Sequence, residues 1–195
     1  MVAIGTSTGG PNALAEILAA LPADLPVPLA IVQHMPALFT AHLAERLDVK
    51  SPLHVAEGVD GACMKAGEAW IAPGGRHMVM ARQGGTVCLR LHDGPPQHSC
   101  RPAVDELFCS ASEAFGPGTL AVLLTGMGQD GARGCERVRD AQGQVLVQDE
   151  ATSVVWGMPG RVAAAGLADA ILPLEAIAGE IERRVRAGRR GRLAA

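Results

Sequence analysis

Several short apolar runs in the chain are typical of strands buried on both faces of a parallel sheet. Three of them span Val2–Ile4, Leu29–Val32 and Leu120–Leu124, and glycine, proline or polar residues follow each one. Two later runs, Gln144–Gln148 and Ala168–Leu172, have similar lengths, and the last is expected at a sheet edge. The pattern therefore predicts a mostly parallel sheet.

Helical periodicity separates these strands. Pro11 favours the first position of a helix, and leucine or isoleucine then recurs at positions 14, 17, 18 and 21, on one helical face. Because helices alternate with strands, we predict an α/β fold, a single doubly wound domain of three layers. The expected helices cover approximately Pro11–Leu21, Phe39–Leu47, Pro102–Phe115, Gly131–Ala141, Pro159–Ala165 and Leu174–Ala187.

The middle third of the chain breaks this rhythm. Ala69–Ala72, His77–Arg82 and Thr86–His92 are short strand-like runs, and Gly84-Gly85 is a hairpin signal. We predict a short antiparallel hairpin appendage on the parallel sheet rather than a second domain. The one domain is expected to span residues 1–187, followed by a flexible basic tail at 188–195.

Composition and charge narrow the class of protein. Hydrophobic residues make up 48% of the 195 residues and charged residues 19%, which excludes a disordered chain. Positions 1–182 hold 11 basic and 20 acidic residues, a balance of −9. This acidic body argues against a nucleic-acid-binding surface. The six arginines between Arg183 and Arg192 fit a solvated helix end, with contact to an acidic partner as the alternative.

The number and spacing of the cysteines and histidines indicate the cellular compartment and whether a metal site is expected. The five cysteines include no C-x-x-C pair, which favours free thiols in a reducing cytoplasm over a disulfide framework. No two histidines have i, i+4 spacing, so we expect neither a zinc site nor another cofactor. No apolar run reaches the roughly 18 residues of a membrane span, and no signal peptide precedes Val2. The sequence thus predicts a cytoplasmic protein without membrane insertion.

Candidate chemistry lies where three of the predicted strands end. Ser7, His34 and Asp130 follow the first, second and later central apolar runs. In open parallel sheets, ligands bind beyond the carboxyl ends of the strands, so these side chains can converge. A serine nucleophile needs a histidine base and a carboxylate that orients the imidazole. The three residues therefore predict a serine hydrolase.

The run Gly5-Thr6-Ser7-Thr8-Gly9 also fits G-x-S-x-G, in which small neighbours allow a sharp turn that exposes the serine oxygen. The order Ser…His…Asp differs from that of α/β-hydrolases, which indicates another lineage. Alternatives stay open for each residue alone. The turn at Ser7 could bind a phosphate, His34 could be a hydrogen-bonded turn residue, and Asp130 could cap the helix near Gly131.

Six blocks, in order, carry a resemblance that runs from Val2 to about Val185. They are Ile4–Pro11 (IGTSTGGP), Gln33–Pro36 (QHMP), Ile71–Met78 (IAPGGRHM), Arg101–Asp105 (RPAVD), Leu123–Gly131 (LLTGMGQDG) and Gln148–Pro159 (QDEATSVVWGMP). Together they closely resemble the catalytic domain of the chemotaxis receptor methylesterases, the CheB family.

The resemblance implies an enzyme that hydrolyses glutamyl methyl esters on methyl-accepting chemotaxis receptors and, in many members, deamidates receptor glutamines. It implies Ser7 as nucleophile, His34 as general base and Asp130 as the orienting acid. The amide of Met127 is then expected in the oxyanion hole, with Thr8 supporting the site. Methanol and ammonia are alternative leaving groups from the same glutamyl carbonyl.

Two departures from the family pattern matter. Cys100 stands where members usually carry histidine, and Ala103 replaces serine. These changes put in doubt the substrate contacts near Arg101, which is either a candidate contact for acidic receptor side chains or a solvated loop residue. Members also usually carry an N-terminal receiver domain, absent before Val2. We therefore expect an excised domain or a stand-alone protein, with a receiver domain as a candidate partner in cis or in trans.

Two other classes of function compete with the hydrolase. A nucleotide or phosphate binder would use the glycine-rich turn at Ser7, but that turn has neither the G-x-G-x-x-G spacing nor a P-loop motif. An adaptor would dock receptors without cleaving them. The intact Ser7, His34 and Asp130 argue against the adaptor.

Overall fold

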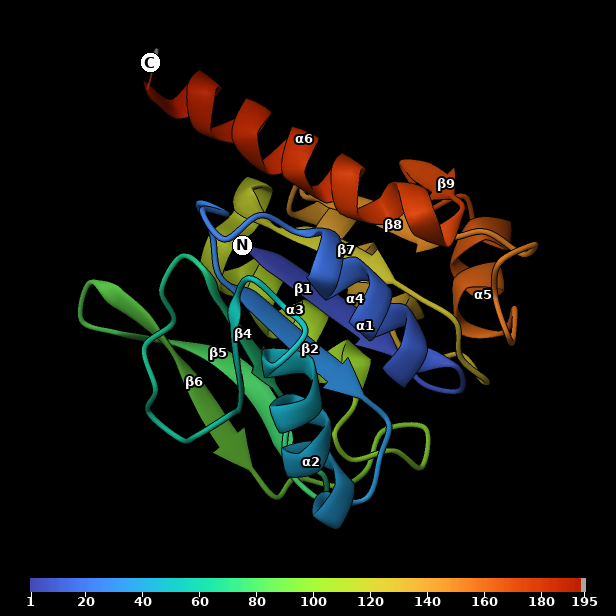
Figure 1. Ribbon diagram of the computed structural model, residues 1–195, viewed down its shortest axis with the longest axis horizontal. Helices are drawn as coiled ribbons and strands as arrows, with labels where there is room; N and C mark the ends of the chain where they lie inside the picture. The colour runs from blue at the N-terminus through green and yellow to red at the C-terminus, as the bar shows by residue number, and fades with distance from the viewer. Residues whose placement is uncertain (194–195) are drawn as a thin grey trace.

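A seven-stranded parallel sheet forms the centre of the molecule (Figure 1). The computed structural model describes the backbone of residues 1–193 and the side chains of residues 1–188. The strand order is β3-β4-β2-β1-β7-β8-β9, so the first strand of the chain lies in the middle. The strands are β1 (Val2–Thr6), β2 (Leu29–Gln33), β3 (His54–Glu57), β4 (Glu68–Ile71), β7 (Leu120–Leu123), β8 (Gln144–Gln148) and β9 (Ala170–Leu172).

Helices cover both faces of this sheet. One apolar cluster joins the sheet to α1, α2 and α6, and a second joins its other face to α3, α4, α5 and the hairpin of β5 (His77–Gln83) and β6 (Thr86–His92). The predicted doubly wound, three-layer α/β fold with an antiparallel hairpin is confirmed. The helices are α1 (Gly10–Ala20), α2 (Ala37–Asp48), α3 (Val104–Phe115), α4 (Ala132–Asp140), α5 (Met158–Ala164) and α6 (Leu174–Leu193), with a 3₁₀ turn η1 at Gly116–Gly118.

The pleat of β1 explains how α3 approaches the sheet. Successive side chains of a strand point to opposite faces, so Ile4 packs in the first cluster and Ala3 in the second. Gly5 leaves room on the α3 side, because a Cβ there would lie 2.3 Å from Val104 Cγ1. The first turn of α3 consequently rests on the carboxyl end of β1.

The fourth strand corrects one prediction. The sequence predicts that residues 69–72 join the antiparallel appendage, but β4 pairs in parallel with both β2 and β3. Its alternating burial, with Ala69 and Ile71 inside, resembles that of a hairpin strand. Strand β3 was not predicted, since only Val55 of its four residues is buried.

A disulfide between Cys63 and Cys88 corrects the prediction of five free thiols. An isolated antiparallel bridge pairs the loop before β4 with β6 and brings the two Cα atoms to 4.0 Å. Because 25 residues separate the two cysteines, no local spacing indicated the pair. Cys100, Cys109 and Cys135 are free.

The last helix packs beside α1 and continues to Leu193 (Figure 1). It therefore crosses position 187, where the sequence predicts the domain to end, and covers most of the predicted basic tail. Positions 194 and 195 of that tail lie outside the described residues. Among the described helices, none is long and apolar enough to cross a membrane.

Candidate active site

The carboxyl edge of the sheet brings two of the predicted site residues into contact. Ser7 directly follows β1 and His34 directly follows β2, while Asp130 lies in the loop between β7 and α4. Since β2 and β7 flank β1, the three residues share one edge. The Nε2 atom of His34 lies 2.7 Å from Oδ2 of Asp130, although 96 residues separate them. The structure thus pairs the predicted base with the predicted acid.

The charge on Asp130 determines which histidine nitrogen is free. Burial opposes ionisation of Asp130, but hydrogen bonds from His34 and from two backbone amides outweigh it and lower the pKa of the carboxyl group. The ionised carboxylate accepts a hydrogen bond from Nε2–H of His34. The lone pair of Nδ1 is therefore the one that can act as a base.

The same carboxylate begins α3. Oδ2 of Asp130 accepts the Val104 amide at 2.7 Å, and Oδ1 accepts the Asp105 amide at 3.0 Å. In return, Oδ1 of Asp105 accepts the amides of Gly131 and Gly134 at the start of α4, at 3.0 and 2.7 Å. The sequence allowed Asp130 to cap the helix near Gly131, but Asp105 fills that role. The two aspartates cap each other's helix.

Asp105 is a residue that sequence reasoning missed. It is fully buried, and burial is the main reason that its pKa is raised. An acidic residue in the first turn of a helix commonly interacts with the dipole of that helix. The position of Asp105 in the sequence therefore does not indicate that it also caps α4. The signal that could have found it is its place in the Arg101–Asp105 block, in which only Arg101 was given a candidate role.

Backbone hydrogen bonds fix the positions of Ser7 and His34. Gln33 Nε2 donates to the carbonyl oxygens of both residues at 3.0 Å. The Ser7 amide donates to Thr125 O at 3.0 Å, and the His34 amide donates to Thr6 O at 3.1 Å. Ser7 is half-buried, and its Oγ makes no hydrogen bond to the described part of the chain. The serine hydroxyl is thus held at the edge and left available for an incoming group.

The glycine-rich loop after β7 lies directly against Ser7. A Cβ on Gly126 would lie 2.8 Å from Ser7 Cβ and 2.5 Å from Met158 Sδ, so only glycine allows this approach. The next residue, Met127, has a side chain that is 66% exposed. Its amide, like that of Thr8, donates no hydrogen bond to another described residue. Two free amide donors therefore flank the serine, as an oxyanion hole needs.

Cys100 contacts the base from the loop before α3. Its Sγ lies 3.6 Å from His34 Nδ1, the nitrogen that Asp130 leaves free. Burial, and secondarily the charge of Asp130, raises the pKa of the Cys100 thiol. The neutral S–H is consequently a weak donor to Nδ1. The sequence marked Cys100 as a departure from the family pattern but did not predict this contact.

His77 and Arg101 hold the loop that carries Cys100. Buried His77 accepts the Ala103 amide at Nδ1 and donates to Pro95 O through Nε2, a role beyond that of a hairpin residue. The Arg101 guanidinium donates to Asp93 O and Gly94 O, both at 3.1 Å. These bonds engage one nitrogen of the guanidinium, Nη1. The predicted contact of Arg101 with the substrate stays a prediction.

One group of side chains could in principle hold a metal ion. His98, Asp105 and Asp130 each offer a ligand atom within 4.8 Å of the others. Hydrogen bonds already engage all three, because His98 Nε2 lies 3.2 Å from Asp105 Oδ2 and the two carboxylates cap helices. Protein groups account for their placement, and we assign no metal to them.

The fold and this site together define a class: a doubly wound α/β domain with serine, histidine and aspartate at the carboxyl edge of its sheet. Residues 2–181 match the family profile described as CheB methylesterase. The crystal structure of the Thermotoga maritima CheB methylesterase catalytic domain superimposes with a TM-score of 0.92 at 43% identity, covering 93% of this chain and 96% of that one. The chain belongs to the CheB methylesterase family.

Curated relatives agree in name. A protein of Trichodesmium erythraeum is 55% identical over 185 residues, which cover 95% of this chain and 53% of the relative. A protein of Rhodopseudomonas palustris is 50% identical over 183 residues, which cover 92% of this chain and 47% of that relative. Both are named protein-glutamate methylesterase/protein-glutamine glutaminase. The chain spans about half the length of the curated relatives it matches.

Proposed function

We propose that this chain is a protein-glutamate methylesterase that also deamidates glutamine side chains. The contact between His34 Nε2 and Asp130 Oδ2, beside a serine with an available hydroxyl, carries the proposal. The name of the T. maritima domain and those of the curated relatives support the substrate class. Ser7 is the nucleophile, His34 the general base, Asp130 the orienting acid, and the Met127 amide an oxyanion donor supported by Thr8.

The reaction follows an acyl-enzyme route. His34 Nδ1 takes the proton of Ser7 Oγ, which attacks the γ-carbonyl carbon of the glutamyl ester and forms a C–O bond. The carbonyl electron pair moves onto oxygen, and the free amides of Met127 and Thr8 stabilise this charge. When the intermediate collapses, the methoxy group leaves with the proton of His34 as methanol. Water then repeats the sequence and releases the glutamate from Ser7.

Deamidation uses the same steps with ammonia as the leaving group. The amide nitrogen of a glutamine takes the proton from His34, and the acyl-enzyme is the same glutamyl ester of Ser7. One site can therefore support both activities. The poorer leaving group makes the amide reaction the slower of the two.

The proposed partners are methyl-accepting chemotaxis receptors, whose glutamyl side chains would be the substrate, in the cytoplasm. A receiver domain, in cis or in trans, is the proposed regulator. The open edge at Ser7 supports a macromolecular substrate, because Met127 and Thr8 on either side of it are exposed. No cofactor is required by the acyl-enzyme route.

Methanol release from methylated receptor tests the proposal. Ser7→Ala removes the nucleophile and should lower the rate at least about a thousandfold, to the residual given by binding and the oxyanion hole. The thermal unfolding midpoint should stay near that of the wild type, because Ser7 Oγ makes no hydrogen bond to any described residue. Thr86→Ala, an exposed hydroxyl deletion at the hairpin tip, is the matched control and should retain full activity. Turnover by Ser7→Ala at the wild-type rate would disprove the proposal.

A further inference from the structure

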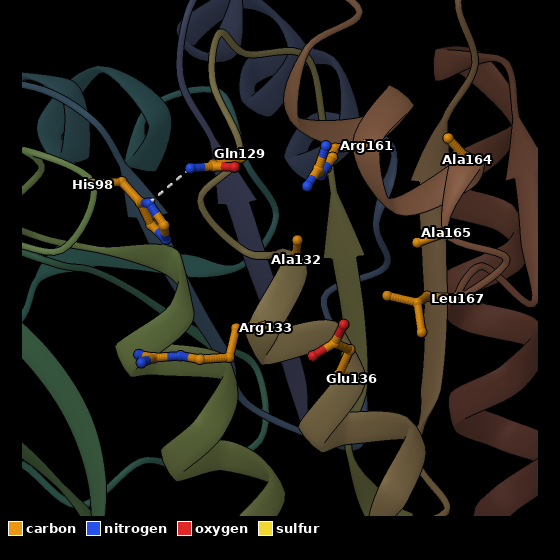
Figure 2. A pocket seen from close by; sticks show the side chains of 9 residues that line it. All are labelled: His98, Gln129, Ala132, Arg133, Glu136, Arg161, Ala164, Ala165 and Leu167. Carbon is orange, nitrogen blue, oxygen red and sulfur yellow. Dashed lines mark hydrogen bonds between the residues drawn. The ribbon is translucent and has the colours of Figure 1, made fainter.

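A groove leads away from the candidate active site between α4 and α5. Its inner part has a volume of about 410 Å³ and is lined on the α4 side by Arg133 and Glu136. A second cavity of about 600 Å³ borders Gly128 and Gly157. His98, Gln129 and Arg161 line both cavities, so the two form one continuous groove. Figure 2 shows Arg161 on α5 and His98 across from it, with Gln129 between them.

The outer end of the groove lies next to the reacting serine. The Arg161 amide donates to Gly157 O at 3.0 Å, and the Gly157 amide donates to Gly126 O at 3.2 Å. A Cβ on Gly126 would in turn lie 2.8 Å from Ser7 Cβ. Arg161 is therefore one helical turn along α5 from the loop that packs against Ser7. Backbone contacts through Gly157 and Gly126 thus connect the segment that carries Arg161 to Ser7.

Arg161 differs from Arg133 and His98, which also line the groove, because those two side chains are paired with acids. Arg133 lies 3.8 Å from Asp105 and 3.7 Å from Glu106. His98 is paired with Asp105. The exposed guanidinium of Arg161 has no acidic partner and no hydrogen bond among the described side chains. It is thus a free cation at the mouth of the site.

The rest of the groove determines where an anion would bind. Glu136 lines the inner cavity only, and Figure 2 places it at the end away from Gln129 and His98. Positions 1–182 carry a balance of −9, so an acidic ligand is repelled by most of the surface. An anion is consequently favoured at Arg161 and disfavoured toward Glu136. The guanidinium plane suits a carboxylate, which it binds through two parallel hydrogen bonds.

We propose that Arg161 is a specificity determinant that binds a side-chain carboxylate of the protein substrate near the reacting glutamyl group. This inference rests on the proposed function, because a substrate rich in glutamyl groups supplies such a carboxylate. Hydrolysis itself creates glutamates. The groove therefore favours substrates in which a neighbouring glutamyl side chain is already unmodified.

Binding to a catalytically inert protein tests the groove separately from the reaction. The full chain carrying Ser7→Ala is titrated with two fluorescent helical peptides, each with one glutamyl methyl ester. One peptide has glutamates four residues before and after the ester, and the other has glutamines there. The glutamate peptide should bind about fivefold more tightly, although the acidic body alone favours the glutamine peptide.

Adding Arg161→Gln should remove this preference and leave binding of the glutamine peptide unchanged. Arg161→Glu should reverse it and favour a peptide with lysines at the two positions. Arg137→Gln, an exposed arginine of α4 that does not line the groove, is the matched control and should keep the preference. The inference is overturned if neither peptide binds, or if Arg161→Gln keeps the preference for glutamate. Neither result depends on methanol release, which tests the proposed function.

Discussion

The carboxyl edge of the sheet and the loop of residues 93–103 meet at His34 but are built in different ways. At the edge, Ser7 and His34 follow regular strands and are fixed by ordinary backbone hydrogen bonds. In the loop, His98 and Ser99 adopt φ values of 50° and 62°, which are uncommon for residues other than glycine. The edge supplies the proposed reacting groups, and the loop supplies Cys100, which contacts His34, the proposed base.

This difference indicates a division of labour. Changes at the edge alter the positions of reacting atoms and should have large effects on rate. Changes in the loop alter a weak contact to His34 or the support of the loop, and their effects should be small. Four substitutions test this comparison, from the largest expected effect to the smallest.

Asp130→Asn should have the largest effect. An amide at this position cannot stabilise the imidazolium and offers an N–H to a nitrogen that also carries a proton, so His34 adopts the wrong tautomer. We expect kcat for methanol release to fall about a thousandfold. Asp140→Asn, an exposed acid at the end of α4, is the control. Unchanged kcat in Asp130→Asn would reassign the residue to helix capping alone.

Gly126→Ala should have the next largest effect. The added methyl group would lie 2.8 Å from Ser7 Cβ and must displace the loop or the serine, so kcat should fall between about tenfold and a hundredfold. Gly179→Ala is the matched control, since nothing lies within 4 Å of a Cβ there. That variant should keep full activity and raise the free energy of unfolding by about 0.5–1 kcal/mol through helix propensity. Equal activity of both variants would contradict the close packing at Ser7.

Cys100→Ala should have a small effect of opposite sign. The thiol is a weak donor to His34 Nδ1, the nitrogen that we propose takes the proton of Ser7, so its removal should raise kcat/KM by no more than about fivefold. Cys109→Ala, a half-buried thiol on α3, serves as the control for cysteine removal. A loss of more than tenfold in Cys100→Ala would show that the loop supplies an essential group.

His77→Gln should alter the pH dependence of stability rather than the reaction rate. Burial is the main cause that lowers the pKa of His77 below the ordinary 6.5. The unfolded chain therefore binds a proton that the folded one resists, and the free energy of unfolding should decrease as pH falls below about 6.5. The slope is bounded by about 1.4 kcal/mol per pH unit. His77→Gln should flatten this dependence in urea titrations between pH 7.5 and 5.5, whereas exposed His42→Gln should not.

The regular part of the molecule was predictable from the sequence. Continuous apolar runs identified β1, β2 and β7, and the rule for parallel sheets placed Ser7, His34 and Asp130 at one edge. Both predictions need only the local pattern of apolar and polar residues and the alternation of strands with helices along the chain. Strands β1, β2 and β7 are neighbours and fully buried. Their carboxyl ends therefore lie side by side, which brings His34 and Asp130 together.

Contacts made by irregular segments were not predictable in the same way. The disulfide of Cys63 and Cys88 depends on how one loop crosses β6. The place of β4 in the parallel sheet depends on pairing with β2 and with β3, and only one residue of β3 is buried. The contact of Cys100 with His34 depends on two residues in the left-handed region, which no periodicity indicates. Tertiary context, rather than local propensity, determines these features.

The exchange of caps between Asp130 and Asp105 links catalysis to folding. The carboxylate that orients His34 is also the one that satisfies the first amides of α3, and α4 begins on a carboxylate that α3 presents. Each helix has its N-terminal cap only when the other is in place, and loss of a cap costs about 0.5–2 kcal/mol, so the proposed catalytic acid and the two helices stabilise one another. Docking of the two helices and placement of the Asp130 carboxylate against His34 therefore favour each other.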